Sequence, residues 1–87
     1  MQRITKAELE SRVNYIAKVL NRPKEYNQIG HLFIDHYNPG GNPYTYKLAE
    51  IANENLGEYD WTNYRMTIRE FYAYLNGIID GLERANK

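Results

Sequence analysis

Apolar residues recur at spacings of three and four in two stretches of the chain, one near each end, which is the period of an amphipathic α-helix. The longer stretch is Met66–Arg84. Its apolar face is formed by Ile68, Phe71, Tyr72, Leu75, Ile78, Ile79 and Leu82. Thr67 and Glu70 have the spacing of a capping box, which predicts the start of the helix. The rest of the predicted fold is arranged around this helix.

A second helix is predicted near the N-terminus, over about Lys6–Leu20. Thr5 and Glu8 form another capping box. The apolar face comprises Leu9, Val13, Ile16 and Leu20. Asn21 is a plausible helix-stop residue, and Pro23 prevents the helix from continuing. Residues 21–29 then read as a connector.

The period changes to two after Gly30, which predicts β-strands. The segments His31–Tyr37 and Tyr44–Ile51 alternate in this way, and Pro39-Gly40 between them fits a type II turn, so an antiparallel hairpin is expected. A short helix over residues 47–56 is an alternative. Residues 52–66 have no clear period, and a loop of this length is usually functional or conceals a short element.

These elements predict an α+β fold, a compact single domain over residues 1–87 with the order α-β-β-α. A two-stranded hairpin is marginal without a partner surface, so we expect both helices to pack on one face of the hairpin. A domain of this size buries roughly 60% of the surface that its unfolded chain exposes.

Composition narrows the functional classes. The sequence has no cysteine, so a disulfide or a thiolate zinc site is excluded. No apolar run approaches the ~20 residues of a membrane span, and the N-terminus resembles a capped helix rather than a signal peptide. We therefore expect a soluble cytoplasmic protein without membrane contact.

The charges are balanced overall but unevenly placed. Residues 1–28 carry six basic and three acidic side chains, whereas residues 29–63 carry one basic and five acidic. The net charge is zero and the pI is about 6.7, which argues against direct nucleic-acid binding. The acidic excess of the middle segment is small and is expected on a solvated surface.

No motif predicts catalysis, a metal or a cofactor. His31 and His36 would point to opposite faces of a strand, so they do not converge with Asp35 on a metal ion. Ser11 is the only serine and lies within a predicted helix, not on a strained turn. Phosphate-binding glycine loops and paired catalytic carboxylates are also missing. The sequence therefore predicts a protein that is not an enzyme.

Two surfaces are candidates for binding. On the C-terminal helix, Ala73, Gly77 and Gly81 fall on one line roughly opposite the Leu75 and Ile79 face, and a candidate surface comprises Tyr74, Gly77 and Gly81. Each glycine costs ~1 kcal/mol relative to alanine within a helix, so a self-association surface would explain them. The alternative is that the helix simply tolerates weak helix formers.

The second surface follows from nine tyrosines, more than a small core can satisfy with hydrogen-bond partners. Tyrosine, tryptophan and arginine dominate interface energetics. The predicted partner-binding residues are Tyr37, Tyr44, Trp61, Tyr64 and Arg65. The alternative is that Trp61 and Tyr64 cover the core, and for Trp61 this alternative is favoured.

The segment Gly40–Leu82, with its Gly-Gly turn, its tyrosine-containing strand and the Tyr-Leu-x-Gly run at Tyr74–Gly77, resembles small uncharacterised proteins encoded by phages and prophages of gut bacteria. These share the helix–hairpin–helix order and a first helix with a cap like Thr5, Lys6, Glu8 and Leu9. The chain differs from them at Asn55–Gly57, where paired glycines are typical. The resemblance implies a viral context and no particular activity.

Three functions follow as hypotheses. The first is a phage-encoded protein that binds a host protein and blocks a bacterial defence factor by steric occlusion, as CRISPR inhibitors do. The second is a structural or regulatory homo-oligomer assembled through Gly77 and Gly81. The third is a sponge for a small nucleotide that uses the aromatic loop and Arg65.

Overall fold

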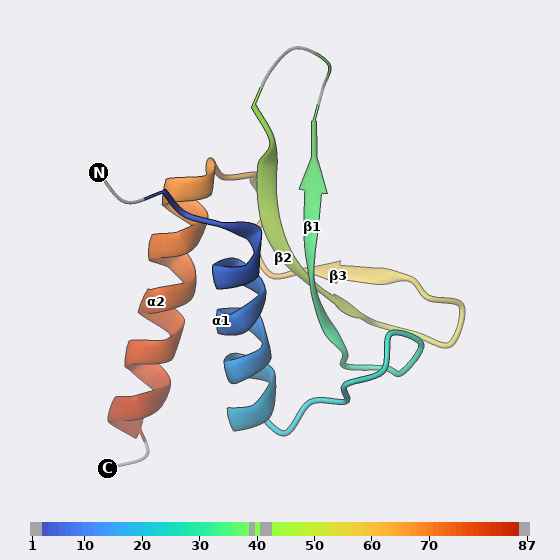
Figure 1. Cartoon of the computed structure of the whole chain (residues 1–87). Helices are drawn as coiled ribbons and strands as arrows, with labels where there is room; N and C mark the ends of the chain where they lie inside the picture. The colour runs from blue at the N-terminus through green and yellow to red at the C-terminus, as the bar shows by residue number, and fades with distance from the viewer. Residues whose placement is uncertain (1–2, 39, 41–42, 86–87) are drawn as a thin grey trace.

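Both helices begin where the capping boxes place them. The N–H of Glu8 donates to Thr5 Oγ1 at 3.2 Å, and the N–H of Glu70 donates to Thr67 Oγ1 at 3.2 Å. Glu70 Oε1 in turn accepts from the N–H of Thr67 at 2.8 Å. In this structure, a computed structural model that describes residues 3–38, 40 and 43–85, the helices are α1 (Lys6–Val19) and α2 (Ile68–Ala85) (Figure 1).

The first helix ends in a Schellman motif. Asn21 adopts φ +59°, and its N–H donates to the carbonyl of Lys18 at 3.1 Å. The N–H of Arg22 donates to the carbonyl of Ala17 at 2.7 Å. These two bonds are the 5→2 and 6→1 pair that defines the motif, with Asn21 in the left-handed conformation that asparagine tolerates. Asn21 is therefore the helix-stop residue, and Leu20 is the C-cap rather than the last helical residue.

The predicted hairpin is present. β1 (Leu32–Tyr37) pairs antiparallel with β2 (Thr45–Ile51), with Asp35 opposite Lys47, so each strand starts one residue later than predicted. The helical alternative for residues 47–56 is wrong, because β2 continues to Ile51. Gly40 has φ +54°, whereas Pro39 of the predicted type II turn lies outside the described residues.

The predicted order lacked one strand. β3 (Glu58–Asp60) pairs antiparallel with β2, so the order is α-β-β-β-α and the sheet order is β1-β2-β3. The loop after β2 positions β3 through Asn53, whose Oδ1 accepts from the N–H groups of Asn55 and Gly57 at 2.9 and 3.0 Å. The long segment 52–66 therefore conceals a short element.

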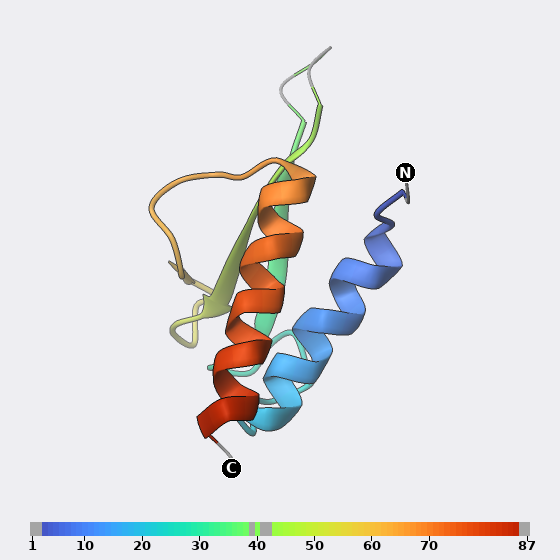
Figure 2. The same ribbon diagram turned by 90° about the vertical axis from the view of Figure 1, so that its left-hand side faces the viewer.

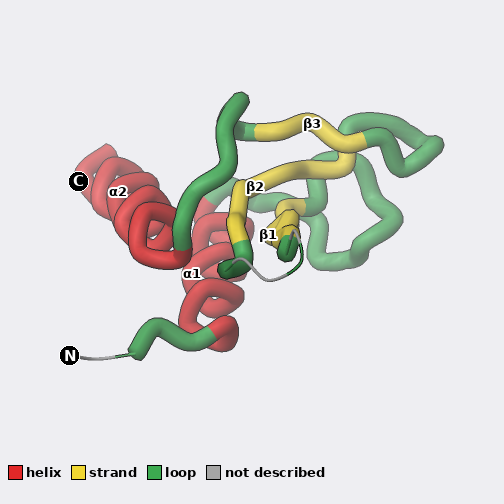
Figure 3. Tube along the Cα trace, turned by 90° about the horizontal axis from the view of Figure 1, so that it is seen from above, coloured by secondary structure: helices red, strands yellow, loops and turns green. Residues whose placement is uncertain are grey.

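The helices form one layer against one face of the sheet, as predicted, and leave the other face without a helix (Figures 2 and 3). The helix α1 packs on β1, and α2 packs on β2 and on α1. Even-numbered residues of β1 and β2, such as Leu32 and Leu48, point to the helices. The buried core cluster comprises Leu9, Val13, Ile16, Leu32, Leu48, Met66, Phe71 and Leu75.

Arg12 connects the two helices. Its Nε donates to Asn76 Oδ1 at 2.8 Å, and its Nη2 donates to the hydroxyl of Tyr72 at 2.8 Å. The guanidinium also lies 4.5 Å from the centroid of the Tyr72 ring. Arg12 thus holds together residues of the two helices that are separated by 60 and 64 positions in sequence.

Candidate binding surface

The helix-free face of the sheet carries a network of opposite charges. Because side chains alternate along a strand, Asp35 on β1, Lys47 on β2 and Asp60 on β3 share this face. The ammonium of Lys47 lies 2.8 Å from Asp60 Oδ2 and 3.9 Å from Asp35 Oδ2. Only 19% of the Lys47 side chain is exposed, so this network is partly removed from water.

Arg65 extends the network to the end of the hairpin. Its Nε donates to Thr45 Oγ1 at 2.8 Å, and its Nη2 donates to the carbonyls of Asp35 and Thr45 at 3.0 and 3.1 Å. Nη2 is also 3.4 Å from Asp35 Oδ1. Arg65 therefore joins β1 to β2, and these donors are already used within the protein. That leaves fewer of them for a small nucleotide, the ligand that the sponge hypothesis assigned to Arg65 and the aromatic loop.

Two of the predicted partner-binding tyrosines lie beside Arg65. The Tyr37 ring is 5.7 Å from the guanidinium, a cation–π arrangement that holds one face of the ring while 55% of the residue stays exposed. Tyr64 precedes Arg65 in sequence and is 58% exposed. Tyr37 and Arg65 are therefore in contact, and Tyr64 adjoins Arg65 in the chain; we call these three residues the Arg65 patch.

The other two predicted partner-binding residues lie elsewhere. Tyr44 stacks on His36, with ring centroids 5.5 Å apart, on the side of the hairpin that faces away from Arg65. Trp61 is partly buried against the core, and its Nε1 donates to Glu50 Oε1 at 3.0 Å. Trp61 thus covers part of the core, as the alternative interpretation of this residue predicted.

The predicted self-association residues lie along one flank of α2. Tyr74 packs partly on the core, and its ring stacks on Phe71 at 6.4 Å. Gly77 and Gly81 are exposed, and a Cβ atom added at either would have no neighbour within 4 Å. No close approach by the described part of the chain therefore explains why these positions are glycine.

Tyr74 and Tyr64 also interact electrostatically. Burial raises the pKa of the Tyr74 hydroxyl above its usual value of 10.0, and the nearby Tyr64 raises it further. Tyr64 therefore lies near Tyr74 on α2.

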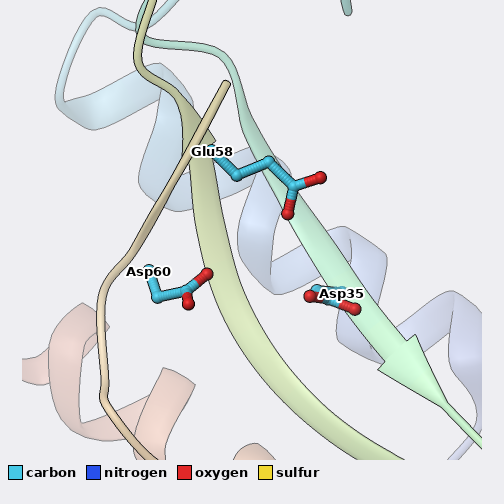
Figure 4. A group of neighbouring side chains, drawn as sticks. All are labelled: Asp35, Glu58 and Asp60. Atoms are coloured by element: carbon cyan, nitrogen blue, oxygen red, sulfur yellow. The ribbon is translucent and has the colours of Figure 1, made fainter. Parts of the chain in front are cut away.

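A group of carboxylates on the helix-free face was not anticipated from the sequence. Asp35, Glu58 and Asp60 place one oxygen each within 4.8 Å of one another, reaching over β2 from β1 and β3 (Figure 4). Such oxygens are suitable ligands for a hard cation. Lys47, however, already donates to Asp60 at 2.8 Å, so a metal ion would compete with its ammonium.

The register of the hairpin was the signal for this network. Strand alternation places Asp35 and Lys47 on the helix-free face, and the pairing of β1 with β2 sets them opposite each other. The residues from β3 had no comparable signal, apart from the alternation of acidic and aromatic side chains over residues 58–61.

The two histidines contact other residues of the protein and not each other. His31 Nδ1 is 3.1 Å from the carbonyl oxygen of Pro23, and His36 is exposed against Tyr44.

Neither helix of the described chain is both long and apolar enough to cross a membrane. Comparison of the chain with protein-family models, curated proteins and solved structures finds no match.

Proposed function

We propose that this protein is a non-catalytic binding module that attaches to a host protein through the Arg65 patch. The viral context of the resemblance makes a bacterial defence factor the target, blocked by steric occlusion in the host cytoplasm. Neither a cofactor nor a covalent step is needed for this mode of action.

The observation that carries the proposal is the exposed ring of Tyr37 held against Arg65, next in sequence to the exposed Tyr64. Aromatic and arginine side chains supply most hot spots, and a rigid side chain loses less entropy on binding than a mobile one. Arg65 is fixed by three hydrogen bonds shorter than 3.2 Å, and it fixes Tyr37 in turn. The patch is therefore preorganised for a partner.

The charge network supports the same surface. Lys47 and Arg65 balance the charges of Asp35 and Asp60, so a partner can cover this network without leaving one of these charges unpaired. The network also offers hydrogen-bond acceptors at the margin of the interface, which is typical of a polar rim.

A defence assay tests the proposal. Bacteria that carry an active CRISPR or other defence system would express the protein and be challenged with phage. We expect plaque numbers to rise when the target system is present. Tyr37→Ala and Tyr64→Ala should each weaken binding to the isolated target about 30-fold, the effect of a hot spot of about 2 kcal/mol.

Tyr15→Ala is the matched control, because Tyr15 is an exposed tyrosine on α1, away from the helix-free face. It should keep full binding. Equal loss in all three variants, or no protection against a broad panel of defence systems, would contradict the proposed function.

The second candidate is a homo-oligomer formed through α2. The open space around Gly77 and Gly81 favours it, because another chain could approach the helix backbone there. Gly77→Ala should raise the stability of a monomer by up to ~1 kcal/mol, since alanine is the better helix former. In an oligomer packed at this flank, the same change should weaken association.

Light scattering across a range of protein concentrations separates the two outcomes. A monomeric mass at every concentration, together with a more stable Gly77→Ala variant, would eliminate the oligomer. A larger mass that falls in the variant would support it.

A further inference from the structure

A pocket of about 350 Å³ lies where the end of α1, the connector and the start of β1 meet. Its basic and potentially basic lining residues are Lys18, Arg22, Lys24 and His31. Ala17, Pro23 and Leu32 add apolar surface. None of the described residues that line this pocket is acidic, and its volume is within the range of small-molecule sites.

Arg22 is held in place from several sides. Its backbone is fixed by the Schellman motif of α1, and its Nη1 is 3.1 Å from Glu50 Oε2. Gly30 lies close to the Arg22 side chain: a Cβ atom added at Gly30 would be 3.3 Å from Nη1 of Arg22. Nε and Nη2 of Arg22 make no hydrogen bond to any described group, so these donors remain for a ligand.

His31 is fixed as well. The carbonyl of Pro23 can only accept a hydrogen bond, so the 3.1 Å contact requires the proton on Nδ1 of His31. The ring is also stacked against Phe33, with centroids 6.4 Å apart. The His31 ring, which directly precedes β1, therefore offers the pocket a positioned aromatic surface.

Lys18 and Lys24 supply further positive charge. Both side chains are exposed, and neither forms an ion pair within the part of the chain that the structure describes. The negative end of the α1 dipole would oppose an anion here. The N–H groups of Leu20, Asn21 and Arg22 offset this effect, because they occupy the carbonyls of Ile16, Lys18 and Ala17.

We propose that this pocket binds a small phosphomonoester. The guanidinium fork of Arg22 suits phosphate oxygens, and a dianion needs the additional charge of Lys18 and Lys24. The organic part of the ligand would lie against the apolar lining and the His31 ring. The site lies at the Leu32 end of β1, whereas the Arg65 patch lies at the Tyr37 end, so the two proposals can fail independently.

Amide NMR spectra recorded at constant ionic strength test this inference with three probes: adenosine 5′-monophosphate, adenosine and inorganic phosphate. We expect the monophosphate to cause saturable shifts in the amides of residues 17–22, 24, 31 and 32. Inorganic phosphate should shift the same amides with weaker affinity, and adenosine should have no effect at equal concentration. Phosphate that binds as tightly as the monophosphate, or the absence of saturable shifts with the monophosphate, would overturn the proposal.

Variants identify the binding groups. Lys18→Gln and Lys24→Gln change exposed side chains, so the free variants should stay folded and give the spectrum of a folded protein. Each should weaken monophosphate binding about tenfold, the typical loss of a hydrogen bond to a charged group. Lys6→Gln is the matched control on the first turn of α1 and should bind normally. An equal loss in the control would indicate diffuse attraction and reject the site.

Discussion

At the scale of single residues, Arg65 shows how one side chain can fasten a hairpin. Its planar fork reaches the hydroxyl and carbonyl of Thr45 and the carbonyl of Asp35 together. A lysine ammonium has the same charge but cannot match this geometry. The contribution of Arg65 therefore depends on shape more than on charge.

Arg65→Lys should lower the free energy of unfolding by about 1–3 kcal/mol, because hydrogen bonds of a charged donor are lost. Urea denaturation would measure it. Arg84→Lys is the control, since the ion pair that Arg84 forms within the described residues, with Asp80 on α2, is exposed. A variant at position 65 as stable as this control would show that the fork is dispensable.

Leu56 is strained in the loop between β2 and β3. It adopts φ +61°, a left-handed conformation that costs a non-glycine residue roughly 1–2 kcal/mol. This position falls within Asn55–Gly57, where the sequence leads us to expect paired glycines. The local backbone thus has the shape of a glycine turn without its usual residue.

Leu56→Gly should raise the melting temperature, because relief of the strain exceeds the roughly 0.4–1 kcal/mol of added entropy in the unfolded chain. Leu56→Ala keeps the strain and removes the half-exposed side chain, so it should bring no such gain. Calorimetry of both variants would decide the point, and a destabilised glycine variant would count against it.

The raised pKa of Tyr74 predicts a loss of stability in alkali. Burial disfavours the tyrosinate in the folded state, so the unfolded chain releases this proton first as the pH rises. The contribution of Tyr74 to the free energy of unfolding is complete below pH 10.0. It declines as the pH rises from there through the pKa of Tyr74 in the folded state. Tyr74→Phe should flatten this decline in unfolding curves, whereas Tyr15→Phe should leave it unchanged.

At the scale of elements, α2 provides the largest fully buried side chain of the described residues, Phe71. Phe71 and Leu75 are fully buried, one turn apart on the face that meets β2 and α1. Ile78 and Leu82 continue this face but are only partly buried. The first half of α2 therefore contributes more to the core than the second half.

Leu75→Ala should cost about 2–5 kcal/mol, since it removes a fully buried side chain and leaves a cavity. Much of so small a domain would then unfold near room temperature, as circular dichroism would show. Leu82→Ala is the graded comparison and should cost less. A fully folded Leu75→Ala protein would mean that this face does not carry the core.

The helices and the hairpin could be predicted because each has a local signal. Thr5 and Thr67 mark helix starts, Asn21 marks an end, and the alternation in β1 and β2 is continuous. β3 could not be predicted in the same way, because its three residues are all exposed and it is ordered by pairing with β2.

The candidate surface could be predicted only in part. The excess of tyrosine indicated that some rings must be exposed, and Tyr37 and Tyr64 are. The contact of Arg65 with Asp35 spans 30 positions and depends on how the chain turns back after β3. Tyr44 and Trp61 do not join the patch, because they lie on the other face of the sheet. The pairing of β2 with β1 and β3 determines these faces.

At the scale of the whole molecule, α1 and α2 run side by side in the same direction, although the entire sheet separates them in sequence (Figure 1). Arg12 bridges them through Tyr72 and Asn76. The hairpin contacts are local by comparison, because β1 and β2 follow each other directly in the chain. The most distant contacts in sequence are thus the ones that close the core.

This arrangement has a consequence for synthesis on the ribosome. Until α2 has left the exit tunnel, α1 and the sheet have no Phe71 or Leu75 to pack against, so Leu9, Val13 and Ile16 cannot be fully covered. Contacts of long sequence separation also slow the final step of folding, because a large loop must close first. We therefore expect the nascent chain to fold only after translation of α2, and to depend on chaperones until then.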